Sequence, residues 1–281
     1  MSSNPRQMDF FFKAMLSSEL RLKDDKESMT LPLCHLGTRK RTTPIKWKHP
    51  NEDRWVVVSA PTNISIASIH DLDIIIFCLS NLNEQVDKGV KRPEKTIKTT
   101  AYNLLKSIGR GTGGREYLNL KDSLDRLTAT TIQTNVRKPK LKQYSIFHWL
   151  DSVHINEDTK ELYLTLPEFL YNGVVDERSI LTVHPDYFNL QSGIAKYLYR
   201  IARKSAGKQS KGFEWSMRTL HERSASLSNY SDFAKNTRKV IAKMNKDKSF
   251  PEYELIIKAQ EKAKGQEMIV MLPKPDTARV S

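Results

Sequence analysis

The chain has 281 residues, of which 38% are hydrophobic and 28% charged, a balance typical of a soluble protein with one large domain or two ordinary ones. Its 46 Lys and Arg residues against 32 Asp and Glu residues give a formal net charge of +14, which favours a polyanionic partner such as nucleic acid over an anionic membrane surface. No run of eighteen apolar residues is present to span a bilayer, no signal peptide is evident, and the two cysteines, Cys34 and Cys78, are too isolated to indicate a disulfide framework or a zinc site.

The first 50 residues show no clear periodicity, and we predict an irregular segment here. Basic residues at positions 39, 40, 41, 46 and 48 are compatible with an arm that touches phosphates, but a solvated loop anchored by Trp47 is the preferred alternative. Residues 54–59 and 63–67 then predict two strands around a turn at Pro61.

An apolar stripe at steps of three and four predicts a helix over residues 71–88, closed by Gly89. A short strand over 95–98 follows, and Thr99 or Thr100 would cap the next helix. The glycine-rich stretch 109–114 lacks the Lys-Ser or Lys-Thr pair of a phosphate loop, so we interpret it as a turn between helices. The helix after this turn would place four residues inward: Tyr117, Leu120, Leu124 and Leu127.

Residues 130–136 and 143–150 predict two strands around a basic turn, and residues 161–166 predict a third strand of the same small sheet. This order of helices and strands is that of a winged helix, with the basic turn as a wing that lies along a phosphate backbone or in a minor groove. In this unit the residues expected to contact DNA are Arg110, Thr112, Arg115 and Asn119 at the glycine-rich turn and Arg137, Lys138 and Lys140 in the wing.

A second unit repeats this order. Predicted strands over 179–183 and 212–215 flank a helix over 193–206, and two further helices precede a closing strand over 253–258. We therefore predict an α+β fold of two tandem winged-helix domains, at residues 51–175 and 176–260. The remaining parts would be the irregular segment over 1–50 and a partly disordered tail over 261–281.

The two helices before the closing strand, over 216–223 and from Tyr230 to about Lys246, predict a DNA-reading helix-turn-helix. Ser228 or Asn229 would cap the second helix, whose expected inner face is Phe233, Thr237, Val240, Ile241 and Met244. An ordinary surface helix with solvated lysines is the alternative. The stretch from Lys196 to Lys248 holds fourteen Lys or Arg residues against four acidic ones, which places +10 of the net charge there.

In a major groove, the outer face of this second helix would meet bases first at its N-terminal end. The residues expected near base edges are Asn229, Ser231, Lys235, Asn236, Arg238 and Lys239. Those expected to meet phosphates are Lys243 and Lys246, with Arg200, Arg203 and Lys204 on the preceding long helix.

The seven histidines are not spaced as metal ligands, and no catalytic constellation is evident. We therefore expect no metal, no cofactor and no enzymatic activity. A metal-dependent nicking enzyme, which would need a histidine pair and a tyrosine nucleophile, is the disfavoured alternative.

Several motifs together resemble the plasmid replication initiator protein A family. They include Arg110-Gly-Thr-Gly-Gly114 followed by Leu124-Asp-Arg-Leu127, then Thr130-Thr-Ile-x-Thr-Asn135 and Tyr197-Leu-Tyr-Arg200. The resemblance extends from about residue 5 to about residue 258.

The resemblance implies an iteron-type initiator, which binds repeated sites in double-stranded plasmid DNA and recruits host replication proteins such as the host initiator and helicase. It implies two winged-helix units without catalytic activity, acting in the bacterial cytoplasm and repressing their own promoter. It also implies a homodimer formed by the N-terminal unit, and we expect the strands at 54–59 and 63–67 near that interface. A transcriptional repressor with the same folds is the main alternative.

Overall fold

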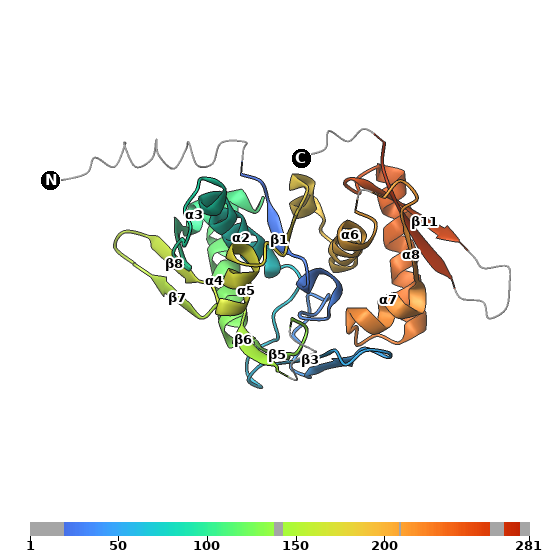
Figure 1. Cartoon of the computed structure of the whole chain (residues 1–281), viewed down its shortest axis with the longest axis horizontal. Helices are drawn as coiled ribbons and strands as arrows, with labels where there is room; N and C mark the ends of the chain where they lie inside the picture. The colour runs from blue at the N-terminus through green and yellow to red at the C-terminus, as the bar shows by residue number, and fades with distance from the viewer. Residues whose placement is uncertain (1–19, 138–142, 208, 259–266, 276–281) are drawn as a thin grey trace.

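The computed structural model describes residues 20–137, 143–207, 209–258 and 267–275. Two lobes are joined by the N-terminal strand β1 (Lys23–Asp25) and by helix α6 (Gly193–Ser205) (Figure 1). Within the described residues, no helix is both long enough and apolar enough to cross a membrane.

The N-terminal lobe contains a winged helix with an antiparallel sheet in the order β4-β8-β7. Its elements are α2 (Leu72–Asp87), β4 (Thr96–Thr100), α3 (Ala101–Ser107), α4 (Gly114–Ala129), β7 (Ser152–Ile155) and β8 (Glu161–Thr165). The predicted cap of α3 is confirmed, because the Thr100 hydroxyl accepts the Asn103 N–H at 3.2 Å.

The C-terminal lobe repeats this topology, with a sheet in the order β10-β12-β11. After α6 it contains β10 (Phe213–Ser216), α7 (Met217–Ser224), α8 (Tyr230–Asp247), β11 (Tyr253–Lys258) and β12 (Met268–Pro273). In both sheets the third strand of the unit lies between the first and the second. The predicted fold of two tandem winged helices is confirmed, and the two sheets are separate.

The expectation of a partly disordered tail after residue 260 is wrong for strand β12. This strand is the central one of its sheet, and Ile269, Val270 and Met271 are buried. The C-terminal unit therefore continues to at least residue 273. The signal was present in the sequence, because Met268-Ile-Val-Met-Leu272 is the continuous apolar run of a fully buried strand.

A four-stranded antiparallel sheet interrupts the N-terminal winged helix. Its order is β2 (Ile45–Lys48), β3 (Trp55–Ser59), β5 (Thr131–Thr134) and β6 (Ser145–His148). The predicted hairpin of β5 and β6 exists, but it pairs with β3 and not with β8, so its turn is not the wing. The wing is the β7–β8 hairpin, whose turn over residues 156–160 is Asn-Glu-Asp-Thr-Lys.

The described part of the N-terminal segment, residues 20–50, is not irregular throughout, and much of it belongs to the core. Beyond β1 and β2 it forms the 3-10 turn η1 (Ser28–Thr30), and Met29 and Leu33 are buried. The strand predicted over 63–67 is also wrong: this stretch has no strand, and the Ile66 N–H donates to the Arg41 carbonyl at 2.8 Å. The partner of β3 on that side is β2 instead.

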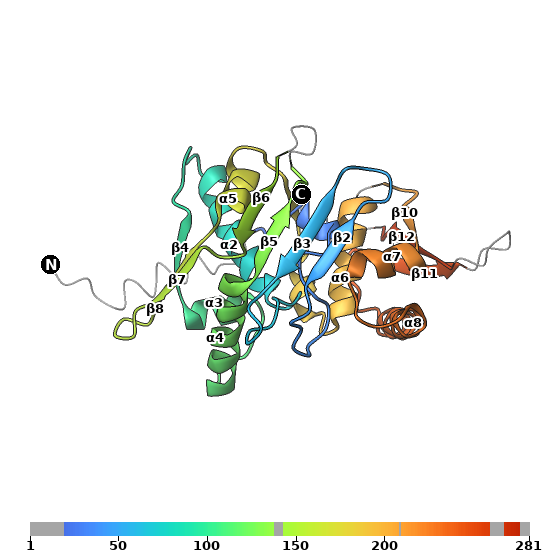
Figure 2. The ribbon, with the colours of Figure 1, turned by 90° about the horizontal axis from the view of Figure 1, so that it is seen from below.

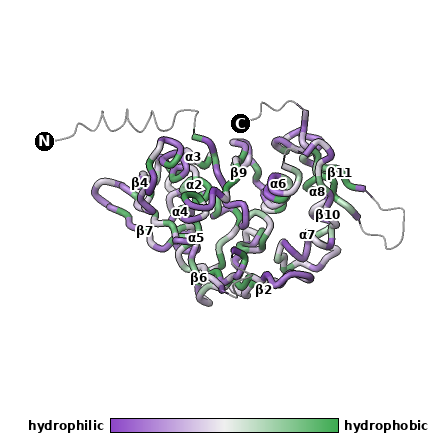
Figure 3. Tube along the Cα trace, in the orientation of Figure 1, coloured by the Kyte–Doolittle hydropathy of each residue, from purple (hydrophilic) through white to green (hydrophobic). Residues whose placement is uncertain are grey.

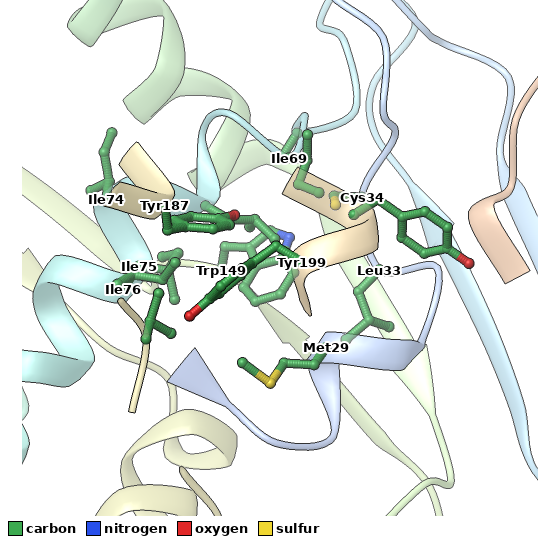
Figure 4. Packing of buried hydrophobic residues seen from close by; sticks show 14 of the residues in the cluster. Met29, Leu33, Cys34, Ile69, Ile74, Ile75, Ile76, Trp149, Tyr187 and Tyr199 are labelled. Atoms are coloured by element: carbon green, nitrogen blue, oxygen red, sulfur yellow. The ribbon is translucent and has the colours of Figure 1, made fainter. Parts of the chain in front are cut away.

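The connection between the lobes is a structural element in its own right. After α5 (Glu168–Val175), strand β9 (Ile180–Thr182) pairs antiparallel with β1, and η3 (Pro185–Asn189) leads into α6. Met29 from the N-terminal segment, Ile74 of α2, and Tyr187 and Tyr199 from the second half all belong to one buried hydrophobic cluster (Figure 4). Hydrophobic residues follow α2 through the interior, whereas the tip of the β7–β8 hairpin is hydrophilic (Figure 3). The two winged helices thus share one continuous core.

Candidate nucleic-acid interface

The helix-turn-helix of the C-terminal unit is held by side-chain caps at both helices. The Ser216 hydroxyl accepts the Thr219 N–H at 3.0 Å at the start of α7. Asn229, one of the two predicted caps of α8, accepts the Asp232 N–H at 2.9 Å through its amide oxygen. Ala225 ends α7 in the left-handed conformation, with φ 50°. These contacts fix the direction in which α8 leaves the turn.

Helix α8 separates its apolar and polar residues onto two faces, as its sequence predicts. Phe233, Thr237, Ile241 and Met244 are buried and Val240 is half-buried. The residues predicted on the outer face are all exposed: Ser231, Lys235, Asn236, Arg238, Lys239, Lys243 and Lys246.

The equivalent helix of the N-terminal unit, α4, has a different surface. It holds three basic and three acidic residues, whereas α8 holds five basic and two acidic ones. The exposed residues of α4 include the large apolar side chains Tyr117 and Leu118. Of the two winged helices, the C-terminal one therefore presents the surface suited to a polyanion.

Two of the predicted base-reading residues already have protein partners. The Arg238 guanidinium donates to both carboxylate oxygens of Glu267 at 2.8 Å, which joins α8 to the residue before β12. The amide of Asn229 caps the helix and donates to Asp232 at 3.1 Å, so this residue holds the helix end rather than being available to a base. Asn236, Lys235 and Lys239 remain the exposed polar residues nearest the middle of the outer face.

The sequence predicts that helix α6 turns its basic residues toward a duplex. In the structure these residues point into the junction between the lobes instead. The Arg200 side chain is 4% exposed and donates to Asp24 of β1 at 2.7 and 3.1 Å and to Ser28 at 2.8 Å. Burial alone would lower the pKa of Arg200, but the Asp24 carboxylate raises it above its usual value. Arg200 is thus a structural cation and not a phosphate ligand.

The neighbouring basic residues on α6 follow the same pattern. Arg203 donates to the Thr182 carbonyl at 2.5 Å, and the Lys204 ammonium lies 3.5 Å from Glu27. Lys196 is buried, with its ammonium 2.8 Å from Asp73 of α2. The number of Lys and Arg residues between Lys196 and Lys248 therefore overstates the positive charge available to DNA, because some of these residues neutralise acidic residues of the N-terminal half.

The DNA-contacting residues predicted at the glycine-rich turn of the N-terminal unit do not form one surface. Arg110 donates to the His70 carbonyl at 2.5 Å and to Asp73 at 3.3 Å, so it supports the inter-lobe junction. Burial lowers the pKa of the adjacent His70 to about 4, which keeps that ring neutral. Thr112 and Arg115 are exposed beside it, and Asn119 is half-buried with its amide 3.4 Å from Glu116.

Of the three predicted wing residues, Arg137 is the one that lies within the described residues, and it does not belong to a wing. Arg137 is buried against Asp25 and Glu177 and lies over the Phe169 ring, with 4.0 Å between the guanidinium carbon and the ring centroid. Lys138 and Lys140 lie outside the described residues. The sequence could not reveal this, because a basic residue after a strand has the same appearance whether its acidic partner is a distant residue or a phosphate.

Across the described ranges, no group of three or more His, Cys, Asp or Glu residues is placed to hold a metal ion.

The family model of Replication initiator protein A matches residues 23–255. The chain belongs to the Replication initiator protein A family. This confirms the resemblance seen in the sequence motifs. A relative from Wigglesworthia glossinidia brevipalpis, named "Putative replication protein", is 33% identical over 207 residues, which cover 71% of this chain and 73% of the relative.

Solved structures share the fold of this family member at low sequence identity. A crystal structure of domains 2 and 3 of RctB superposes with a TM-score of 0.61 at 13% identity, covering 88% of this chain and 97% of that one. The Pi initiator protein in complex with iteron DNA superposes with a TM-score of 0.51 at 16% identity, covering 74% and 94%.

Proposed function

We propose that this Replication initiator protein A family member initiates plasmid replication by binding double-stranded origin repeats through α8. The observation that carries the proposal is the outer face of α8, the second helix of a capped helix-turn-helix. This face presents exposed basic and amide side chains. The iteron DNA bound by the structurally similar Pi initiator supports repeats as the ligand. This role belongs to the bacterial cytoplasm, where plasmid DNA is found.

The chemistry of the α8 face divides into base-reading and phosphate-binding parts. Asn236 can form two hydrogen bonds with adenine, and Lys235, Lys239 or Arg238 can donate to guanine. Arg238 would exchange its Glu267 partner for the base. Lys243 and Lys246 lie further along the helix, where a duplex in contact with its N-terminal end presents phosphates.

Footprinting of the purified protein on the origin of its own plasmid tests this proposal. We expect protection of regularly spaced repeats, at protein concentrations that leave a scrambled repeat of equal length and composition unprotected. Equal binding to the scrambled DNA at every salt concentration would contradict sequence-specific recognition and leave only electrostatic binding.

We also infer that the protein acts without catalysis, binds the host initiator and helicase, and represses its own promoter. Its binding surface would serve a transcriptional repressor equally well, so a plasmid maintenance assay must accompany a promoter-reporter assay. Loss of the plasmid when DNA binding by α8 is removed supports the initiator. Normal plasmid maintenance with a derepressed promoter supports the repressor.

Two further results would contradict the other parts of this inference. Metal-dependent cleavage of origin DNA by the pure protein would contradict the non-enzymatic role. Failure to retain the host proteins in binding assays would contradict recruitment.

We further propose a homodimer formed by the N-terminal unit. Strand β3 cannot supply a free edge, because it lies between β2 and β5. Strand β6 is an edge strand of that sheet, and Tyr144 and Ile146 beside and within it are 61% and 57% exposed. Sedimentation velocity of the intact chain should show a dimer that Ile146→Asp shifts to monomer. A wild-type chain that stays monomeric at micromolar concentration would contradict the proposal.

A further inference from the structure

The loop over residues 37–44, which leads into β2, is held between the two winged helices by contacts on three sides. The Arg41 guanidinium donates to the carbonyl of Ala225 in the turn between α7 and α8, and to the Thr43 carbonyl at 3.0 Å. Arg41 is 7% exposed, so it acts as an internal anchor of the loop. The turn of the helix-turn-helix and this loop of the N-terminal half are therefore in direct contact.

The residue just before this loop, Leu36, approaches α6, and the loop itself shares a cavity with α4. A Cβ atom at Gly193, the first residue of α6, would lie 1.9 Å from the Leu36 carbonyl oxygen, so only glycine allows this approach. Thr38 and Lys40 line a cavity of about 450 Å³ together with Asp122 and Asp125 of α4. In Figure 2, α4 and α8 lie on the same lower side of the molecule, and the blue segment that leads into β2 lies between them.

An aromatic contact beside the loop reinforces this arrangement. The Arg223 guanidinium of α7 lies 5.4 Å from the Trp47 ring centroid in β2 and 5.0 Å from that of Trp215 in β10. Trp47 therefore ties the four-stranded sheet to the helix-turn-helix. Because Arg41 anchors the middle of the loop and Trp47 anchors the strand that follows it, the residues just before Arg41 have a defined position.

Two cations project from this anchored loop. Arg39 and Lys40 are exposed, and the Lys40 ammonium donates to the Asn63 carbonyl at 2.5 Å, a neutral acceptor that leaves its charge uncompensated at that contact. They stand one and two residues from Arg41, and Arg41 touches the turn immediately before α8. The N-terminal end of a recognition helix is the part that enters the major groove. Arg39 and Lys40 are thus held next to a residue that contacts the turn before α8.

We infer that Arg39 and Lys40 form a second DNA contact, which binds the sugar–phosphate backbone along the minor groove next to the major groove entered by α8. This inference rests on the proposed function of α8. A basic loop beside a helix-turn-helix reaches the adjacent minor groove because the two grooves alternate along one face of the duplex, and the narrow groove has the stronger negative potential. The contact supplies affinity and register and does not read bases.

The test compares wild type with Arg39→Ala/Lys40→Ala and with Lys88→Ala/Lys91→Ala, which removes the same charge from exposed positions after α2. Losing two phosphate contacts should reduce affinity about ten-fold near physiological salt and reduce the slope of log K against log salt by about 1.8. The control variant should keep the wild-type affinity and slope. Hydroxyl-radical footprinting should show loss of backbone protection beside the α8 site in the loop variant alone.

The outcomes separate this inference from the proposed function. If Asn236→Ala/Arg238→Ala abolishes specific binding but the loop variant matches the Lys88→Ala/Lys91→Ala control in affinity, slope and footprint, the second contact is overturned and α8 stands. If neither the loop nor the α8 variant changes binding, the proposed function itself fails. Arg39→Ala alone keeps the Lys40–Asn63 contact, and its slope of log K against log salt should change by about half as much as that of the double variant. It guards against a folding defect in the double variant.

Discussion

Replacing Arg200 by alanine is expected to lower the free energy of unfolding by about 3–5 kcal/mol, because it leaves the buried Asp24 carboxylate without its cation. The Asp24 side chain is 3% exposed, and Arg200 is the partner that donates to both of its oxygens. The pair links β1 to α6, so its loss also loosens the junction of the two lobes. Urea denaturation followed by circular dichroism measures the change.

Two control variants make the Arg200 result specific to the buried pair. Arg92→Ala breaks the exposed pair between Arg92 and Asp176, whose side chains are 67% and 42% exposed, and should cost no more than about 1 kcal/mol. Arg200→Met/Asp24→Leu replaces both charges with apolar groups and should recover most of the lost stability. Arg200→Ala with stability equal to that of Arg92→Ala would show that the junction does not depend on this pair.

Removing Asn236 or Arg238 is expected to weaken binding to the specific repeat by about 1–3 kcal/mol each and to relax specificity at one base position. Lys243→Ala provides the contrast: it should weaken binding to specific and random DNA equally and reduce the salt slope by about one. Competition binding with repeats substituted at single positions distinguishes these two patterns.

The contact between Arg238 and Glu267 gives this experiment an internal control. The Arg238 side chain is 50% exposed and that of Glu267 17%, so the pair is partly solvated and Glu267→Gln should cost no more than about 1 kcal/mol, while releasing Arg238 for DNA. Specific binding should therefore persist in Glu267→Gln and fall in Arg238→Ala. A folded Asn236→Ala/Arg238→Ala protein that still binds its repeat with wild-type specificity would mean that α8 only presents solvated charge.

The two binding surfaces proposed for DNA differ in how far sequence could identify them. The outer face of α8 follows from one helix and its period, and each of its predicted residues is exposed. The loop at Arg39 and Lys40 has a basic sequence compatible with either a phosphate-binding arm or a solvated loop. The contact between Arg41 and Ala225, 184 residues apart, is what places it beside the helix-turn-helix.

Local patterns in the sequence determined the helices α2 and α8 and the order of elements that makes two winged helices. They also narrowed each of two helix caps to a pair of neighbours, of which Thr100 and Asn229 form the cap. These features depend on neighbours within a few residues, where side-chain period and hydrogen bonding to the backbone are decided. Only the tertiary structure decided which strands pair, as for β5 with β3, and which cations are available. Arg137, Arg200 and Arg110 have acidic partners far along the chain, at Asp25, Asp24 and Asp73. A charge has no periodicity that reveals its partner, so its role is fixed only when folding brings the two together.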